Sequence, residues 1–245
     1  MSAGQTASAK SSNFYDLRFY HLRSDRADQA RRTTTLLAGA YKPAAQRAGA
    51  GPVGLFNAVV ANETPFILCL TSFPSLEVYQ DLREKLAGDA AYQKSLADYN
   101  GGADPGFMRM DSWLLRAFDF FPSVSVRPPG SPRASRVFEM RTYRSLNEAT
   151  LREKIKMMGD GEVGIFRKTG CDPIFFGEAI AGADLPHLTY MLAYDNLAAR
   201  EKNWAAFQAD PDWQKLRTTP EYAAPGLVIN IDNPILGAVQ GSDIT

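Results

Sequence analysis

Two short segments of the chain carry the same charged and aromatic residues at the same alternating positions. They read Y-D-L-R-F-Y at 15–20 and F-E-M-R-T-Y at 138–143. In a β-strand, alternate side chains point to the same face, so each segment would place an acid, an arginine and a tyrosine side by side. A guanidinium can anchor an anion or a carbonyl oxygen, and a tyrosine hydroxyl can donate a further hydrogen bond to it. The members of this candidate ligand-binding set are Asp16, Arg18, Tyr20, Glu139, Arg141 and Tyr143.

The same residues have a simpler interpretation. An acid and an arginine two positions apart on one strand face lie roughly 7 Å apart at the backbone, which is within reach for an ion pair. A buried charge needs such a partner, because an unpaired buried charge is strongly destabilising. Structural ion-pair networks are common, so the alternative to a binding site is a set of charges that neutralise each other inside the protein.

The two segments are the start of a longer internal repeat. An offset of 123 residues aligns the segments, and an offset of 121 holds without a gap from residue 49 onward. The pairs at this second offset include Gly49 with Gly170, Pro65 with Pro186, Asp89 with Asp210, and Tyr92 with Trp213. Self-similarity at a fixed period indicates a repeated structural unit. The sequence therefore predicts two copies of one unit, at residues 14–118 and 136–239.

Each unit reads as strand, helix, strand, strand, helix, strand. In the second unit we expect strands at 137–143, 173–181, 188–194 and 227–231. Ser145 and Glu148 form a plausible capping box for the first helix, which is interrupted at 159–161 and ends at Gly170. The second helix is expected from 196 or 197 to 209, where D-P-D-W at 210–213 closes it with a structural role.

This order is that of a ferredoxin-like α+β unit, a four-stranded antiparallel sheet with helices on one face. We expect a disordered segment at 1–13, a proline-rich linker at 119–135 and a short C-terminal tail at 240–245. The apolar residues of each first strand should face the helices, and the acid–arginine–tyrosine set should face a space shared by the two sheets. Phe175 should share that space, and Glu178 would reach it only if a bulge at Gly177 reversed the alternation.

The segment E-M-R-T-Y at 139–143, together with Y-D-N-L-A-A-R-E-K-N-W-A-A-F-Q-A-D-P-D-W-Q-K-L at 194–216, resembles the NIPSNAP family. That family is part of the dimeric α/β-barrel superfamily, whose relatives include antibiotic-biosynthesis monooxygenases and chlorite dismutases. The resemblance covers both units and is sharper in the second, since the first has Ala90 and Tyr92 in place of the proline and tryptophan. It implies that the two sheets pack into a barrel of the dimeric type within one chain. It implies no catalytic residues.

Composition excludes several classes of function. Lys+Arg and Asp+Glu both number 27, which argues against a broad nucleic-acid-binding surface. Cys69 and Cys171 fit neither a disulfide framework nor a metal cluster, and neither His21 nor His187 has an acid or cysteine at metal-ligand spacing. No nucleotide-binding glycine loop is present, and neither histidine falls on an expected helix as a haem ligand would, so we expect no cofactor.

No apolar stretch is long enough to cross a bilayer. Cytoplasmic localisation is the default expectation, and export is the alternative if residues 7–9 are the remnant of a trimmed signal peptide. Two functional hypotheses remain. The first is a barrel cavity that binds, or transforms, a small hydrophobic carbonyl or phenolic molecule. The second is a non-enzymatic interaction module with a filled barrel. Homo-oligomerisation through sheet edges is expected in either case.

Overall fold

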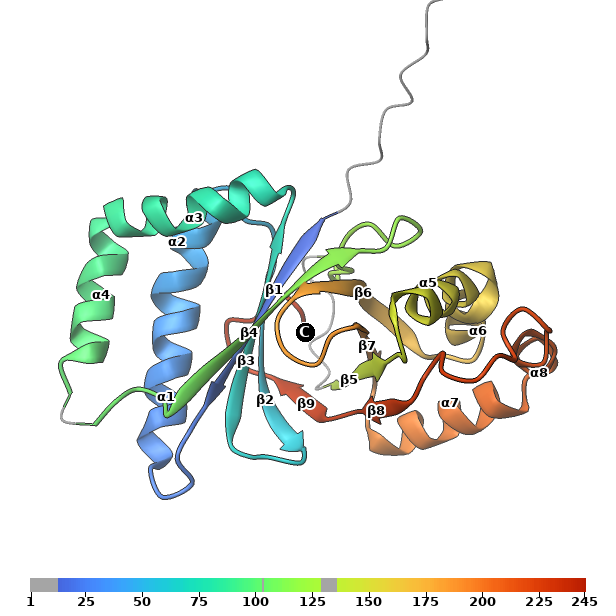
Figure 1. Cartoon of the computed structure of the whole chain (residues 1–245). Coiled ribbons are helices and arrows are strands. Elements are labelled where there is room, and N and C mark those ends of the chain that lie inside the picture. Colours follow the sequence, from blue (N-terminus) through green and yellow to red (C-terminus); the bar gives the residue numbers. More distant parts are fainter. Residues whose placement is uncertain (1–12, 103, 129–135) are drawn as a thin grey trace, which may run out of the picture.

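The two halves of the chain run through the same order of elements (Figure 1). The structure is a computed structural model that describes residues 13–102, 104–128 and 136–245. The first half contains β1 (Phe14–His21), α1 (Ala27–Leu36), the π-helical η1 (Leu37–Tyr41), α2 (Lys42–Arg47), β2 (Val53–Val60), β3 (Phe66–Phe73), α3 (Leu76–Gly88), α4 (Ala90–Asn100) and β4 (Arg109–Ala117). The second contains β5 (Val137–Arg144), α5 (Glu148–Met157), the π-helical η2 (Met158–Glu162), α6 (Val163–Lys168), β6 (Asp172–Ala181), β7 (His187–Tyr194), α7 (Leu197–Ala209), α8 (Pro211–Arg217), β8 (Asn230–Asp232) and β9 (Ile235–Ala238).

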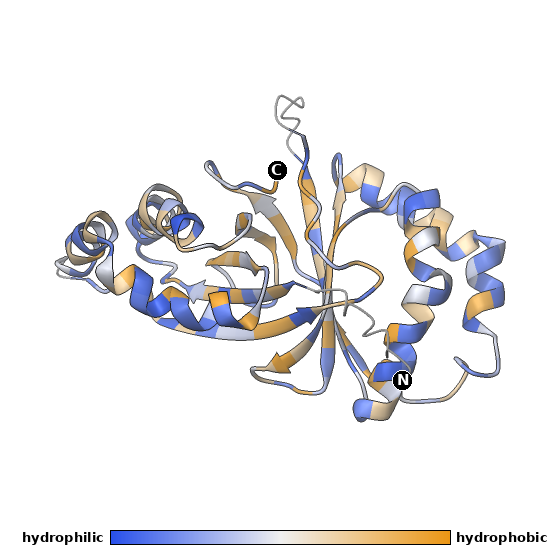
Figure 2. Ribbon diagram, turned by 90° about the horizontal axis from the view of Figure 1, so that it is seen from above, coloured by the Kyte–Doolittle hydropathy of each residue, from blue (hydrophilic) through white to orange (hydrophobic). Residues whose placement is uncertain are grey.

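The strands close into one eight-stranded antiparallel barrel. Strand β4 of the first half pairs with β6 of the second, and β9 bridges β2 and β5 at the other junction. The helices of the two halves lie on opposite outer sides of the barrel, as the view from above shows (Figure 2). The fold class is therefore α+β, with two ferredoxin-like sheets joined into a barrel of the dimeric type. None of the helices in the described ranges is long and apolar enough to cross a membrane.

Equivalent features of the two halves occur at the offsets read from the sequence. Strand β1 pairs with β3 in the register Phe14↔Phe73, and β5 pairs with β7 in the register Val137↔Tyr194. The π-helical segments begin at 37 and 158, and the positive-φ glycines that follow the first helices are at 49 and 170. Each half thus repeats the local geometry of the other, including the irregular turn of helix.

Several local predictions are corrected by the structure. The N-cap of α5 is Asn147, whose side chain accepts from the backbone of Ala149 and Thr150, whereas Ser145 donates to the carbonyl of Leu227 at 2.6 Å. The segment 210–213 ends α7 as expected, but Asp210 also caps the next helix, α8.

The predicted last strand, 227–231, is correct only at 230–231, since the observed strand starts at Asn230. The observed strand forms two pieces, β8 and β9, which pair with β5 on either side of residues 233–234. Leu227 instead packs beneath α5, where it is buried against Met157, whereas Ile229 is exposed. Apolar character alone did not distinguish a strand from a packed loop here.

The segments predicted outside the two units are only partly described. Residues 1–12 and 129–135 lie outside the described residues. In the remainder of the 119–135 segment, Phe121 and Val124 are buried. The predicted tail at 240–245 packs into the protein, because Ile244 belongs to the barrel core and Arg136 donates to the carbonyl of Thr245.

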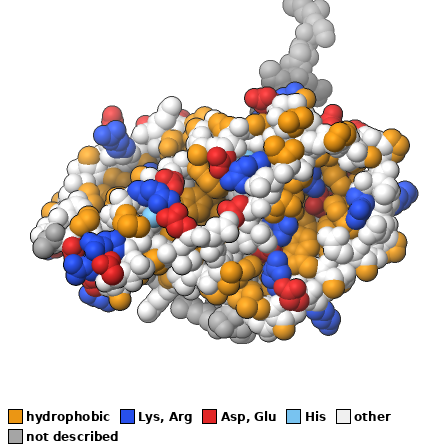
Figure 3. Space-filling view, turned by 60° about the horizontal axis from the view of Figure 1, so that its bottom comes forward, with side chains coloured by type: hydrophobic (Ala, Val, Ile, Leu, Met, Phe, Trp, Pro, Cys, Tyr) orange, Lys and Arg blue, Asp and Glu red, His pale blue; other side chains and the backbone are white. Residues whose placement is uncertain are grey.

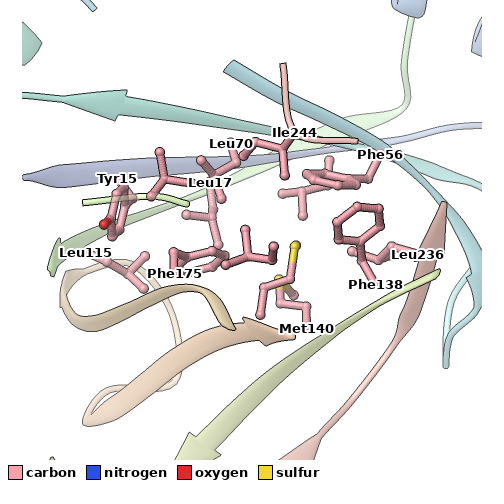
Figure 4. Close-up of a cluster of buried hydrophobic side chains, with 14 of the residues drawn as sticks. Tyr15, Leu17, Phe56, Leu70, Leu115, Phe138, Met140, Phe175, Leu236 and Ile244 are labelled. Atoms are coloured by element: carbon pink, nitrogen blue, oxygen red, sulfur yellow. The ribbon is translucent and has the colours of Figure 1, made fainter. Parts of the chain in front are cut away.

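The apolar residues of the first strands fill the barrel interior (Figure 4), which reverses the predicted orientation of these strands. Tyr15, Leu17 and Phe19 from β1 meet Phe138 and Met140 from β5 in this central core. The acid–arginine–tyrosine set faces the helices instead. The alternation was read correctly, but both faces of each sheet are buried, one by helices and one by the opposite sheet. The apolar set takes the centre because no helix side chains are available there to satisfy charges.

Candidate functional site

In the first half, Asp16 and Arg18 form an ion pair on the helix-facing side of β1. The Nε atom of Arg18 lies 2.7 Å from Oδ2 of Asp16, and Ser112 Oγ donates to the other carboxylate oxygen at 2.8 Å. Asp16 is fully buried, whereas the Arg18 side chain keeps 26% of its exposure. The acid is therefore satisfied, and the arginine reaches a solvent-accessible space.

In the second half, Glu139 is surrounded by donors from β5, α7, β7 and the β8–β9 connection, the β7 donor being the Tyr194 hydroxyl at 3.5 Å. Arg141 contacts it at 2.6 Å, and Arg200 of α7 donates to both carboxylate oxygens at 2.7 and 3.0 Å. Trp204 Nε1 donates at 2.7 Å, and Asn233 donates at 3.1 Å. Burial acts to raise the pKa of Glu139, but the hydrogen bonds from Arg200 and the charge of Arg141 outweigh it, so the pKa lies below its usual range.

The remaining groups of this second-half network leave little room beside them. The Trp204 ring covers the Arg141 guanidinium at 4.5 Å. Tyr143 accepts hydrogen bonds from Arg141 Nε at 3.1 Å and from the Tyr190 hydroxyl at 2.7 Å. Arg141 retains only 12% of its side-chain exposure. Geometrically, this half matches the structural ion-pair alternative.

The first half has an open pocket at the corresponding place, which we call the Arg18 pocket. It has a volume of about 560 Å³ and lies between β1 and the helices α3 and α4. Its lining combines two arginines, two tyrosines, two glutamines and an apolar wall. The lining residues are Arg18, Tyr79, Gln80, Leu82, Arg83, Leu86, Ala87, Tyr92, Gln93 and Leu96.

Residue size at equivalent positions explains why one half is open and the other closed. At the offset of 121, Arg83 corresponds to Trp204, the residue that covers the arginine in the second half. Cys69 likewise stands where Tyr190 fills the second half. Tyr79 stands in place of Arg200 and packs on Phe73 with ring centroids 5.3 Å apart, so it does not reach the β1 carboxylate as Arg200 does.

The Arg18 pocket is electrostatically positive. Its lining contains two arginines and no acid, and Asp16, which pairs with Arg18, is fully buried. Burial opposes the charge of Arg18, but Asp16 outweighs it and keeps the pKa above its usual value. Since Asp16 binds Nε, the terminal nitrogens of the guanidinium are not engaged by that carboxylate. The arrangement can hold an anionic or carbonyl oxygen at its floor.

Not every sequence candidate belongs to this pocket. Tyr20 is half-buried and packs against Phe107 at 5.3 Å, and it is not part of the lining. Phe175 lies in the barrel core, 5.3 Å from Tyr15. Glu178 is half-buried, in register with Leu188 of β7. Phe175 and Glu178 are therefore not brought together with Arg18, whereas the Tyr20 hydroxyl stays beside it and interacts with it through a side-chain hydrogen bond and its charge.

Sequence reasoning missed the helix residues that shape the pocket. Tyr79, Arg83 and Tyr92 come from α3 and α4 and carry no motif of their own. The repeat register contained the signal, because it sets Arg83 opposite Trp204 and Tyr79 opposite Arg200. A change of residue type at equivalent helix positions that face the strand therefore marks a space that only one copy fills.

Comparisons with known proteins agree with this architecture. Residues 138–240 match the NIPSNAP family model. A crystal structure described as a "putative monooxygenase" from Lactobacillus acidophilus is similar over 93% of this chain and 98% of its own, with a TM-score of 0.58 at 11% identity. A second protein so described, from Fusobacterium nucleatum, covers 94% of both chains with a TM-score of 0.57 at 7% identity.

A third structure, an anthrone oxidase-like protein, is similar over 94% of this chain and 92% of its own, with a TM-score of 0.52 at 10% identity. No curated protein matches the sequence. At these identities the structural likeness establishes the fold alone. The chain thus carries a NIPSNAP domain at residues 138–240, within an α/β barrel of the dimeric type that is closed by a single polypeptide.

Proposed function

We propose that the protein binds a small hydrophobic molecule with a carbonyl or phenolic oxygen in the Arg18 pocket. The observation that carries this proposal is the contrast between the two halves. The same strand position is sealed by Trp204 and Arg200 in the second half and is left open, over about 560 Å³, in the first. Ligand pockets of small molecules typically enclose about 300–1,000 Å³.

One part of the lining suits the oxygen of such a ligand, and another part suits its apolar body. Arg18 and Arg83 supply the positive charge that would attract an oxygen, and Leu82, Leu86 and Leu96 supply an apolar wall for its body. Tyr79 and Tyr92 carry hydroxyls whose pKa is raised by burial, so they remain protonated and able to donate. The names of the fold neighbours, which include an anthrone oxidase-like protein, support an oxygen-bearing aromatic ligand.

The test compares the binding of ligands that share one ring system and differ in whether they carry an oxygen. We expect 2-naphthol and 2-acetylnaphthalene to raise the melting temperature of the wild-type protein, and naphthalene to raise it less, because only the first two offer an oxygen to Arg18. The variant Arg83→Trp places in the first half the residue that fills the second half. We expect this variant to fold normally and to lose most of the ligand-induced shift.

The matched control is Glu84→Trp. This change adds the same ring to an exposed neighbour on α3 that does not line the pocket. Binding should survive it. A shift of equal size for Arg83→Trp and wild type would exclude the Arg18 pocket as the binding site, and equal shifts for naphthalene and 2-naphthol would exclude recognition of the oxygen.

A protein-interaction role is the second candidate, and exposed apolar side chains favour it. Val59 and Val60 at the end of β2, with Ile229 and Ile231 near β8, keep between 44% and 59% of their exposure. Large exposed apolar patches mark interaction surfaces. Sedimentation of wild type and Val60→Lys would separate the candidates, because a self-association lost in the variant, together with no ligand response, favours interaction over ligand binding.

A further inference from the structure

A second pocket opens at the end of the barrel where β1 finishes, on the sheet face opposite Arg18. We call it the barrel-mouth pocket. It has a volume of about 190 Å³ and is lined by residues of β1, β3, β4 and β5, by the β2–β3 connection, and by Asp232 and Pro234 at β8 and just after it. Figure 3 looks onto this end of the molecule, where basic and acidic side chains gather among hydrophobic ones.

The histidine at the end of β1 contributes an unsatisfied nitrogen to this pocket. His21 lines the pocket and keeps only 7% of its exposure, so it is more than nine-tenths buried. Its Nε2 atom lies 2.9 Å from Asp111 Oδ2 and 3.4 Å from Arg109 Nη2; because a carboxylate only accepts, the shorter contact assigns the proton to Nε2. Nδ1 makes no hydrogen bond within the described residues and lies 3.5 Å from Glu63 Oε1. With the proton on Nε2, Nδ1 is a buried acceptor that faces a second acceptor, Glu63 Oε1, so a donor group between the two atoms would satisfy both.

The charges around His21 also favour a ligand that donates. The pocket lining contains three carboxylates, Glu63, Asp111 and Asp232, and no lysine or arginine. Arg109, outside the lining, pairs with Glu63 through two bonds of 2.8 Å and lies 3.6 Å from Asp111. One arginine against three carboxylates leaves an excess of negative charge. An anionic ligand is disfavoured in this environment and a cationic one is favoured.

The walls of the barrel-mouth pocket are aromatic. Phe19 packs on Trp113 with ring centroids 4.9 Å apart and on Phe66 at 5.8 Å, and all three rings line the pocket. Aromatic faces attract organic cations, most strongly when water is excluded. A cavity on the order of 150 Å³ accommodates a benzene-sized molecule, so the space here suits a body of one ring or a short alkyl chain.

We propose that the barrel-mouth pocket binds a small organic ammonium ion. Its N–H groups donate to His21 Nδ1 and to the carboxylates, and its apolar body lies against Phe19, Phe66 and Trp113. The pocket is lined by acids where the Arg18 pocket is lined by arginines, and the two lie on opposite sides of β1. A carbonyl or phenolic molecule and an ammonium ion would therefore occupy opposite faces of β1, and this proposal does not depend on the function proposed for the Arg18 pocket.

Three probes of one size and different charge test the proposal: benzylammonium, benzyl alcohol and benzoate. On the full chain at pH 7 and low salt, titration calorimetry should show benzylammonium binding at least tenfold more tightly than benzyl alcohol, and no benzoate binding that depends on this pocket. Benzylammonium should also shift the indole N–H resonance of Trp113, assigned by its absence in Trp113→Phe. Added salt should weaken binding, since the attraction is between charges.

Variants then locate the site. Asp111→Asn, at a half-exposed position, removes one charge and the anchor of His21, so we expect benzylammonium affinity to fall about tenfold, as for loss of a charge-assisted hydrogen bond. Asp98→Asn, an exposed acid on α4, should bind as wild type. The proposal is overturned if benzyl alcohol binds as tightly as benzylammonium, if no Trp113 shift occurs in the wild-type protein, or if Asp111→Asn and Asp98→Asn behave alike. The Trp113 shift is measured on the wild-type chain, so it holds even if Asp111→Asn fails to fold.

Discussion

Glu139 shows how a single buried carboxylate can organise the second half. It is completely buried and receives hydrogen bonds from Arg141, Arg200, Trp204 and Asn233. Replacing it by glutamine removes the buried counter-charge of Arg141 and Arg200, which keep 12% and 17% of their side-chain exposure, and leaves Arg200 only its exposed partner Glu201. We expect Glu139→Gln to lower the free energy of unfolding by about 3–5 kcal/mol, the range found when one partner of a buried ion pair is removed. Urea unfolding would measure this loss of stability. The matched control is Glu201→Gln, on the exposed face of α7, which should change the free energy of unfolding by less than about 0.5 kcal/mol.

The pH dependence of stability offers a second measurement on the same residue. The folded-state pKa of Glu139 is below that of an unfolded glutamate, which is about 4.3. The unfolded state therefore binds more protons in this range, so the contribution is fully present above about pH 4.3 and is lost as pH falls through the lower folded-state pKa. Between pH 6 and pH 3, wild type should lose more stability than Glu139→Gln. Equal slopes for the two proteins would contradict the role assigned to this carboxylate.

At the residue scale, the sequence correctly predicted which residues form ion pairs, but it did not predict which face of the sheet they occupy. Asp16 with Arg18 and Glu139 with Arg141 do form ion pairs, as the spacing of two residues indicated. The face of the sheet could not be predicted, because alternation separates two sets of side chains without saying which one the helices cover. The Arg18 pocket could not be predicted either, because Tyr79, Arg83 and Tyr92 line it from helices that are distant from β1 in the sequence.

At the scale of elements, the first helix of the second half ends at a glycine with a specific backbone requirement. Gly170 has φ of +83°, and a Cβ there would lie 2.9 Å from the side-chain nitrogen of Asn203, which donates to the Gly170 carbonyl. Gly164, inside α6, is exposed, and a Cβ at that position would meet no neighbouring atom within 4 Å. We expect Gly170→Ala to destabilise by about 1–2 kcal/mol and Gly164→Ala to stabilise by about 0.5–1 kcal/mol.

Thermal unfolding of the two alanine variants measures the difference directly. Gly49 serves as the control, because it shares the positive φ of its counterpart but would place its Cβ 3.4 Å from Val78, an ordinary contact. Gly49→Ala should therefore destabilise less than Gly170→Ala. A Gly170→Ala protein as stable as wild type would show that the helix end can adopt another conformation.

Elements were predictable where local sequence decides them and less so where tertiary packing does. The order of strands and helices, the interruption at 159–161 and the bounds of α7 followed from periodicity, glycine and proline. The interruption is a π-helical segment, a class that the sequence did not distinguish from a kink. The split between β8 and β9 follows from pairing with β5 and β2, which no local pattern encodes.

At the scale of the whole molecule, the barrel core joins the two halves into one cooperative unit. Phe56 of the first half meets Phe138 of the second with ring centroids 5.0 Å apart, and Ile244, near the end of the chain, is fully buried in the same core. Neighbouring residues fasten this last segment to the first half, since Asp243 accepts from Lys42 at 2.8 Å and from the backbone of Val53 at 2.9 Å. Neither sheet can therefore be exposed without disrupting the core of the other.

This arrangement predicts that a change at Ile244 destabilises both halves equally. Ile244→Ala removes apolar contacts and leaves a cavity, so we expect a loss of about 2–5 kcal/mol in the free energy of unfolding. Two reporters follow the halves separately: Trp113 alone, in a protein with Trp204→Phe and Trp213→Phe, and those two tryptophans alone, in Trp113→Phe. Since Trp204 also donates to Glu139, each reporter protein is compared with its own Ile244→Ala derivative. The midpoint should fall by the same amount in both, in a single transition. A fall in the midpoint that only the Trp113 reporter shows, or two separated transitions, would contradict this prediction. Either result would show that the halves fold independently and that the shared core does not couple them.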